Sequence, residues 1–218
     1  MIHYYPIGKR LLDLLLCGLV LPLALPLMGM VAGISALLFR HPVLYSHLRP
    51  GYRGIPFRFY KFSTLLPEEE REGRWLSEGE RQTRWGKFLR DYSLDELPQL
   101  LNILKGDMSW VGPRPLLMEY LPLYTPAEKR RHWVKPGLTG LAQVMGRNEL
   151  LWEEKMRYDQ AYVARLSLRL DCAILAKTVA TVLVGQRINF GIRPEQLLTA
   201  SGSSHSPKKP SLSAENAF

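Results

Sequence analysis

Leu14–Phe39 reads LLLCGLVLPLALPLMGMVAGISALLF, and these 26 residues contain no charged side chain. The run exceeds the roughly 18 apolar residues that indicate a membrane segment. Lys9 and Arg10 precede it, and Arg40 follows it. A signal peptide also begins with basic residues, but this run is too long for one, and no small-residue cleavage motif closes it. Residues 1–40 are therefore predicted to form a membrane anchor.

Two prolines, Pro22 and Pro26, lie near the middle of this run. Each removes a backbone N–H and clashes with the preceding turn, so we expect the helix to break or bend there. One interpretation is a kinked spanning helix, because membrane helices tolerate proline. The other is a re-entrant helix–break–helix anchor that enters one leaflet and returns, with basic residues on the same side of the membrane at both ends. The residues alone favour neither.

The composition limits the classes of partner that the chain is expected to bind. Its 218 residues are enough for one ordinary domain with extra elements, and its formal net charge is +9. Nucleic acid, an anionic membrane surface and a phosphorylated substrate all fit this charge. The two cysteines, Cys17 and Cys172, have neither metal-ligand spacing nor the spacing of a redox pair. A disulfide framework is therefore not expected.

Residues 43–66 are predicted to be extended and rich in turns. Within them Phe57–Phe62 (FRFYKF) alternates aromatic and basic residues at period two, as a half-buried strand does. Alternating aromatic and basic residues can bind nucleic acid. Here it is short, unrepeated and follows a membrane segment, so no nucleic-acid partner is expected. The other predicted segments are a solvated loop or short helix (67–86), two amphipathic helices (151–166 and 169–186) and a disordered tail (191–218).

The stretch Ser93–Asn102, SLDELPQLLN, places two adjacent carboxylates, Asp95 and Glu96, at the start of a predicted helix. Ser93 and Glu96 match a capping box, and these ten residues alone favour capping over catalysis. A helix N-terminus also stabilises ionised carboxylates and attracts phosphate, which keeps catalysis open. The spacing expected for one buried face of a helix is shown by Leu97, Leu100, Leu101 and Leu104.

Later segments carry candidate phosphate-binding residues. Arg114 lies between two prolines in a loop rich in glycine, an arrangement that suits bidentate phosphate recognition. Residues 136–148 (PGLTGLAQVMGRN) contain three glycines and are predicted to pass close to a ligand, with Gln143 inside the loop and Arg147 at its end. Neither Walker nor Rossmann spacing is present. The basic cluster 129–135 is predicted to be a solvated face, or a contact to anionic headgroups if it lies near a membrane.

In this order and spacing, the motifs resemble the monotopic phosphoglycosyl transferase family of bacterial sugar transferases. Within it the chain is similar to the small single-domain members that start glycan assembly on polyprenyl phosphate. The resemblance runs from about Lys9 to Arg187. It is carried by Lys9-Arg10 with Asp13, the apolar run, Arg49-Pro50-Gly51, Tyr60-Lys61-Phe62, Arg90, Ser93–Gln99, Leu104–Ser109, Gly112–Pro115, Pro136–Val144 and Gly146–Asn148.

The resemblance implies an enzyme that transfers a phospho-sugar from a UDP-sugar to polyprenyl (undecaprenyl) phosphate and releases UMP. It implies that Asp95 is the nucleophile of a covalent intermediate, and that Mg²⁺ lies at Asp95 and Glu96. Glu96 either activates polyprenyl phosphate or holds the metal. The candidates for phosphate or nucleotide binding are Arg90, Arg114, Arg147, Lys61 and Gln143.

The expected fold is α/β, mostly helical and irregular, with a catalytic domain over residues 41–190. The expected place is the cytoplasmic face of the bacterial inner membrane, among its lipids, and a homodimer is compatible with the chain. One alternative is a membrane-bound glycosyltransferase that moves only the sugar and releases UDP. Another is an inactive membrane-anchored adaptor. Residues 116–124 resemble members that use a diacetylated bacillosamine nucleotide, but the sugar stays open.

Overall fold

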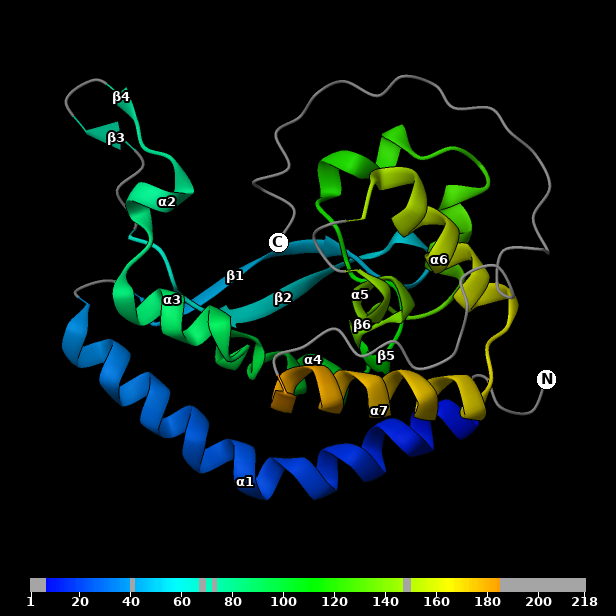
Figure 1. The fold of residues 1–218 in the computed structure, drawn as a ribbon, viewed down its shortest axis with the longest axis horizontal. Coiled ribbons are helices and arrows are strands. Elements are labelled where there is room, and N and C mark those ends of the chain that lie inside the picture. The colour runs from blue at the N-terminus through cyan, green and yellow to red at the C-terminus, as the bar shows by residue number, and fades with distance from the viewer. Residues whose placement is uncertain (1–6, 40–41, 67–69, 72–73, 147–149, 185–218) are drawn as a thin grey trace.

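The computed structural model describes residues 7–39, 42–66, 70–71, 74–146 and 150–184. Figure 1 shows one long helix beneath a body of short helices and small sheets, so the prediction of a mostly helical, irregular fold is confirmed. The predicted tail at 191–218 lies outside the described residues. The α-helices are α1 (Lys9–Leu38), α2 (Glu78–Arg81), α3 (Arg84–Asp91), α4 (Gln99–Lys105), α5 (Leu141–Met145), α6 (Trp152–Ala164) and α7 (Leu168–Val184). The 3₁₀ turns are η2 (Tyr52–Gly54), η3 (Leu94–Glu96), η4 (Met118–Leu123) and η5 (Glu128–Trp133).

Short strands pair two by two. They are β1 (Leu44–Pro50) with β2 (Pro56–Phe62), β3 (Glu70–Arg71) with β4 (Arg74–Trp75), and β5 (Ser109–Val111) with β6 (Gly137–Thr139). The first two pairs are antiparallel and the third is parallel. The strand expected at 57–62 is confirmed: Phe57 and Phe59 are buried in the core and Arg58 between them is exposed. The hairpin β1–β2 therefore presents one face to the core.

Most of the surface of α1 is apolar and exposed. Leu19, Leu23 and Leu37 are 73%, 78% and 89% exposed. The helix is long and apolar enough to cross a membrane, and only 17% of its most apolar window is buried inside the protein. A core helix of a soluble protein would be mostly buried. A leucine side chain that stays exposed to water is about 1.5–3 kcal/mol less favourable in free energy than a fully buried one, so this surface favours contact with lipid.

Both ends of α1 are joined to the body by polar contacts. Near the first end, Asp13 Oδ1 accepts hydrogen bonds from the Ser109 hydroxyl at 2.8 Å and the Trp110 backbone N–H at 2.9 Å. Near the other end, Trp85 Nε1 donates to Ser35 Oγ at 2.8 Å. These buried side chains are hydrogen-bonded, as groups removed from water need to be. The body therefore holds α1 at two widely separated points.

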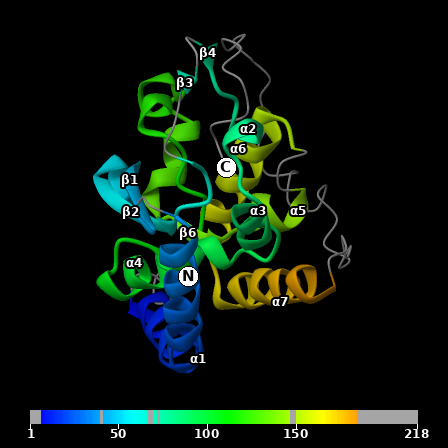
Figure 2. The same cartoon turned by 90° about the vertical axis from the view of Figure 1, so that its left-hand side faces the viewer.

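The helix runs without interruption through Pro22 and Pro26. Figure 1 shows it bent near its middle, with both ends directed toward the body. A proline inside a helix removes one hydrogen bond and bends the axis without having to end the helix. The two separate helices of the predicted helix–break–helix anchor are thus a single bent helix here. Figures 1 and 2 show α3, α4 and α7 on the side of the body that faces α1.

The helix expected at the Ser93 stretch differs from the prediction. It begins only at Gln99, after Pro98, and ends at Gly106, whose φ of 89° suits a glycine. Its buried residues are Gln99, Leu100, Asn102 and Ile103, whereas Leu101 and Leu104 are each 37% exposed. The predicted leucine face was therefore wrong at these two positions. Asn102 is buried because its side chain donates to the Arg58 carbonyl at 2.6 Å and accepts from the Tyr60 N–H at 3.3 Å.

The part of the glycine-rich loop that the structure describes, residues 136–146, packs closely against Gly112 at Gly137 and Gly140. A Cβ on Gly137 would lie 2.1 Å from the backbone nitrogen of Gly112, and a Cβ on Gly140 would lie 2.1 Å from the Gly112 carbonyl oxygen. These glycines let the loop after β5 and the loop around β6 approach closely. The parallel pair β5–β6 thereby fixes the backbone that leads into Arg114.

Candidate active site

Asp95 and Glu96 stand in the 3₁₀ turn η3, between α3 and α4. Ser93, which precedes the turn, has a left-handed φ of 55° and makes no side-chain capping bond. The capping box predicted for Ser93 and Glu96 was therefore wrong. A residue in this conformation turns the chain sharply, and the Glu96 side chain is used elsewhere. The two carboxylates are thus presented by a tight turn rather than by a helix N-terminus.

A cleft of about 600 Å³ brings most of the predicted site residues together. Its lining includes the predicted residues Lys61, Arg90, Asp95, Glu96, Arg114 and Gln143. Arg147 lies outside the described residues. The residues come from β2, α3, η3, α5 and the loop after β5, which are far apart in the sequence. Apolar side chains of α1, α4 and α7 (Val20, Leu100 and Leu175) line the same cleft.

Asp95 lies in an environment that favours its neutral form. The residue is only 5% exposed. Burial and the neighbouring charge of Glu96 together raise the pKa of its carboxyl to about 6, although Lys61, Arg114 and Arg90 act in the opposite direction. A carboxyl with this pKa is still ionised at neutral pH, yet is poorly solvated. No hydrogen bond is recorded for Asp95 among the described residues, so its oxygens are available for chemistry.

Glu96 is held by Arg114. Arg114 Nη2 forms a short ion pair with Glu96 Oε1, and Nη1 lies 3.4 Å from Oε2. This bidentate, end-on pairing fixes the planes of both groups. The two adjacent carboxylates therefore differ, since Glu96 is neutralised by an arginine and Asp95 is not.

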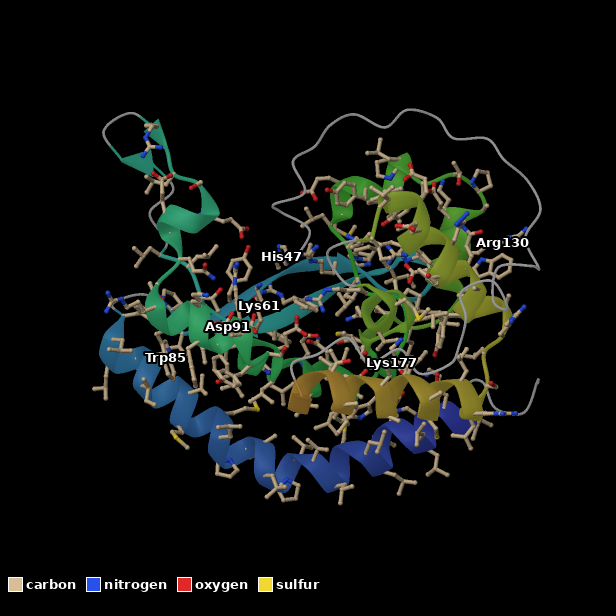
Figure 3. All side chains as sticks on the ribbon, viewed as in Figure 1. His47, Lys61, Trp85, Asp91, Arg130 and Lys177 are labelled. Carbon is tan, nitrogen blue, oxygen red and sulfur yellow. The ribbon has the colours of Figure 1, made fainter. Side chains whose placement is uncertain are left out.

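The remaining predicted residues surround Asp95. Lys61 is partly buried, which lowers the pKa of its ammonium group, while the charge of Asp95 raises it. Arg90 donates from Nε to Thr64 Oγ1 at 3.0 Å and from Nη1 to Glu78 Oε2 at 3.3 Å. Figure 3 shows Lys61 in the region between the hairpin and α3. Cations thus face the dyad from a strand and a helix.

Gln143 reaches the cleft from α5. Its Nε2 donates to the Leu138 carbonyl at 3.0 Å. Its Oε1 is enclosed and has no hydrogen-bond partner among the described residues. This oxygen is free to accept a hydrogen bond from a ligand.

Arg131 is a residue of the cleft that the sequence analysis missed. The basic cluster 129–135 was predicted to be solvated, but Arg131 and His132 are buried. Arg131 pairs with Asp159 at 2.8 Å and donates to the Tyr124 hydroxyl at 2.8 Å and to the Arg114 carbonyl at 2.7 Å. These bonds compensate the burial of the charge. Arg131 and Asp159 line the cleft and support the backbone of Arg114.

The donor set can be compared with what Mg²⁺ requires. No group of three or more His, Cys, Asp or Glu side chains is found among the described residues. Mg²⁺ is usually bound by one or two carboxylates together with substrate phosphates. Asp95 and Glu96 supply two hard oxygen donors in one turn, so the residues fit this ion when a phosphate completes its coordination.

A model of the bacterial sugar transferase family matches residues 4–185. The chain is 47% identical over 180 residues to the uncharacterized sugar transferase EpsL of Bacillus subtilis, and the alignment covers 83% of this chain and 89% of that protein. It is 36% identical over 192 residues to the undecaprenyl-phosphate galactose phosphotransferase of Salmonella typhimurium, covering 80% of this chain and 40% of that protein.

A third relative is the UDP-glucose:undecaprenyl-phosphate glucose-1-phosphate transferase of Klebsiella pneumoniae. It is 38% identical over 181 residues, which cover 78% of this chain and 39% of that protein. The Salmonella and Klebsiella proteins are thus much longer than the matched region. The family match spans the anchor helix, the hairpin and the whole cleft. The chain belongs to the bacterial sugar transferase family.

Proposed function

We propose that this chain transfers a sugar 1-phosphate from a UDP-sugar to polyprenyl phosphate and releases UMP. The observation that carries the proposal is the buried Asp95, which has no partner among the described residues and is surrounded by Lys61, Arg90 and Arg114. The name of the Klebsiella relative specifies glucose-1-phosphate as the transferred group. Removal of a sugar 1-phosphate from a UDP-sugar leaves UMP by the balance of atoms.

In the first step, an oxygen of Asp95 attacks the phosphorus that carries the sugar. The bond from that phosphorus to the bridging oxygen breaks, and UMP leaves with the bridging oxygen and the electron pair. In the second step, a phosphate oxygen of polyprenyl phosphate attacks the same phosphorus, and the bond to Asp95 breaks. The products are polyprenyl diphosphate-sugar and the free carboxylate. A covalent intermediate divides one difficult transfer into two easier ones.

The cations around Asp95 support this reaction. Lys61, Arg90 and Arg114 lower the pKa of Asp95 and so keep the nucleophile ionised near neutral pH. The same groups stabilise the charge that develops on phosphate oxygens during transfer. Asp95 and Glu96 would hold Mg²⁺, which neutralises diphosphate charge when it is bound. Because Glu96 is already paired with Arg114, we assign it to metal or arginine positioning rather than to nucleophilic attack.

We place the enzyme at the cytoplasmic face of the bacterial inner membrane, where α1 enters one leaflet and returns. The support is that the body binds α1 near both ends, through Asp13 and Ser35. Polyprenyl phosphate carries its phosphate at the membrane surface. The apolar wall formed by Val20, Leu100 and Leu175 leads from α1 toward the dyad and suits such a lipid.

The proposed function is tested by identifying the nucleotide product. Purified full-length protein is incubated with undecaprenyl phosphate, Mg²⁺ and a panel of UDP-sugars, and nucleotides are separated by chromatography. UMP is expected with at least one sugar. UDP as the first product would instead support the glycosyltransferase alternative, and no product with any sugar would support the adaptor. The panel also identifies the sugar that is transferred.

The activity is expected to fall as the pH drops through about 6. The pKa of Asp95 is raised to about 6, so the nucleophile is protonated below that pH and ionised above it. The measurement is kcat/KM for the UDP-sugar over a range of about pH 4.5 to 8. In a Lys61→Met variant the acidic limb of the pH–rate profile should move to higher pH, because a positive charge that lowers the pKa of Asp95 is removed. A limb near pH 4 in the wild type would contradict the assignment.

The topology of α1 gives a further expected result. Protease sites are inserted before Lys9 and after Leu38, and cleavage is measured in inside-out membrane vesicles. Both sites are expected to be cleaved, because both ends of α1 attach to the same body. Protection of one site would indicate a spanning helix. A Pro22→Leu/Pro26→Leu double variant tests whether the prolines produce the bend: protection of its first site is then expected.

A further inference from the structure

One guanidinium in the hairpin β1–β2 lacks a partner although the fold encloses it. Arg49 is 8% exposed, and its Nε and Nη1 atoms are buried without a hydrogen bond among the described residues. Its Cζ lies 5.8 Å from the centre of the Phe59 ring. That contact offsets part of the cost of burial, but it satisfies none of the N–H donors. A buried guanidinium of this kind is suited to an anionic ligand.

Arg49 belongs to a row of side chains on one face of the hairpin. Tyr45 is opposite Lys61, His47 is opposite Phe59, and Arg49 is opposite Phe57. Alternate residues of a strand share a face, so Lys61, His47 and Arg49 lie on the same side of the hairpin. Figure 3 shows His47 and Lys61 along this hairpin. The row therefore extends from Lys61, which lines the cleft, to Arg49.

The positively charged groups along this row lie close enough to affect one another's pKa values. Burial and the charge of Arg114 together lower the pKa of Arg49 to about 10. Burial also lowers the pKa of His47 to about 4, with Arg49 and Lys61 acting in the same direction. Glu119 is the carboxylate that acts against these shifts at both residues. Cations held close together with a single opposing carboxylate produce the positive potential that a phosphate group requires.

We infer that Arg49 binds the α-phosphate of the UDP-sugar, the phosphate that leaves as part of UMP. This inference rests on the proposed function. Attacking and leaving oxygens lie roughly in line in phosphoryl transfer, so the α-phosphate sits on the side of the reacting phosphorus away from Asp95. Arg114 pairs with Glu96, and its charge also acts on Arg49, so Arg49 lies near the arginine that holds the dyad. The charges that act on Asp95 are those of Glu96, Lys61, Arg114 and Arg90, so Arg49 is farther from the nucleophile, where the leaving phosphate is expected.

The experiment measures UMP binding by isothermal titration calorimetry with the full-length protein in detergent. Arg49→Gln is expected to weaken UMP affinity about tenfold or more, and Arg49→Lys to retain part of it. Arg58→Gln is the matched control, because Arg58 lies on the same hairpin, is exposed and belongs to the opposite face. In turnover assays, Arg49→Gln should raise the KM for the UDP-sugar and leave the KM for polyprenyl phosphate unchanged.

A second variant acts in the opposite direction and does not depend on a buried residue. Glu119 is exposed, and Glu119→Gln removes the carboxylate whose negative charge acts on both His47 and Arg49. It is expected to tighten UMP binding severalfold, a gain that misfolding cannot produce. UMP affinities of Arg49→Gln and Glu119→Gln equal to that of Arg58→Gln would overturn the inference. If the affinities are equal but the wild-type enzyme still releases UMP, the proposed function stands and only the role of Arg49 is overturned. If the wild-type enzyme releases UDP, the proposed function itself is overturned.

Discussion

Asp95→Asn is expected to abolish UMP release, with a loss of at least about 10³-fold in rate. The asparagine keeps the shape of the side chain but cannot form the acyl phosphate bond, so both half-reactions stop. The measurement is a single-turnover assay with a labelled UDP-sugar and no polyprenyl phosphate, which isolates the first step. Wild-type protein is expected to release UMP in an amount equal to the enzyme and to retain the labelled phospho-sugar.

Asp91→Asn is the matched control for this variant. Asp91 is a carboxylate only four positions away, on α3, and forms an exposed pair with Lys87 at 3.6 Å. Such a surface pair contributes little, so the control should release UMP at the wild-type rate. UMP release by Asp95→Asn at a rate near that of Asp91→Asn would exclude the covalent mechanism.

The same variant is expected to be more stable than the wild type at neutral pH. The pKa of Asp95 in the folded protein, about 6, lies above its ordinary value of 3.8. The folded state therefore holds a proton that the unfolded state releases between these two values, and stability falls as the pH rises through this window. Above pH 6 the cost is on the order of 3 kcal/mol. A higher Tm for Asp95→Asn at pH 7.5, with no difference below pH 4, would show that its inactivity is not misfolding.

The central part of the site could be predicted from the sequence because its residues stand in chemically distinctive motifs. Asp95 and Glu96 are adjacent carboxylates with a proline two positions after Glu96, and Arg114 lies between two prolines. Stiff backbone of this kind limits where a side chain can be, so the residue type already indicates its use. The structure brings these three residues into one cleft together with Lys61 and Arg90.

The buried face of α4 could not be predicted in the same way. Periodicity indicates which residues share a face, but not which polar groups a neighbouring element offers to that face. Asn102 is buried because the backbone of β2, at Arg58 and Tyr60, supplies its hydrogen-bond partners. Leu101 and Leu104 lie elsewhere on the helix and stay partly exposed. The outcome depends on a contact between residues more than 40 positions apart.

Arg131 escaped prediction for a related reason, and it carries the second large expected effect. In the run Lys129–His132 nothing distinguishes one basic residue from the next, because the partner of Arg131 is Asp159 on α6. Arg131→Met is expected to lower the free energy of unfolding by about 3–5 kcal/mol, since Asp159, only 3% exposed, would be left as an unpaired buried charge. The measurement is thermal or chemical unfolding of the full chain in detergent.

Arg130→Met is the matched control for Arg131→Met. Arg130 is the neighbouring residue, is exposed, and places its guanidinium 5.6 Å from the centre of the Trp133 ring. An exposed contact of this type contributes about 0.5–1 kcal/mol, so Arg130→Met should unfold close to the wild type. Figure 3 shows Arg130 at the periphery of the body, in keeping with this small effect. Equal losses in the two variants would contradict the importance assigned to the buried pair.

The double variant Arg131→Met/Asp159→Leu separates the stabilising role of Arg131 from its positioning role. Replacement of both members of a buried ion pair by apolar residues is often neutral, so most of the lost stability should return. UMP release should not return with it, because Arg131 Nη2 donates to the Arg114 carbonyl, and neither methionine nor leucine can replace that bond. Arg114 in turn holds Glu96 beside the nucleophile. A stable but slow double variant would therefore assign to Arg131 the placement of Arg114, whereas recovery of both stability and rate would assign to it only the compensation of Asp159.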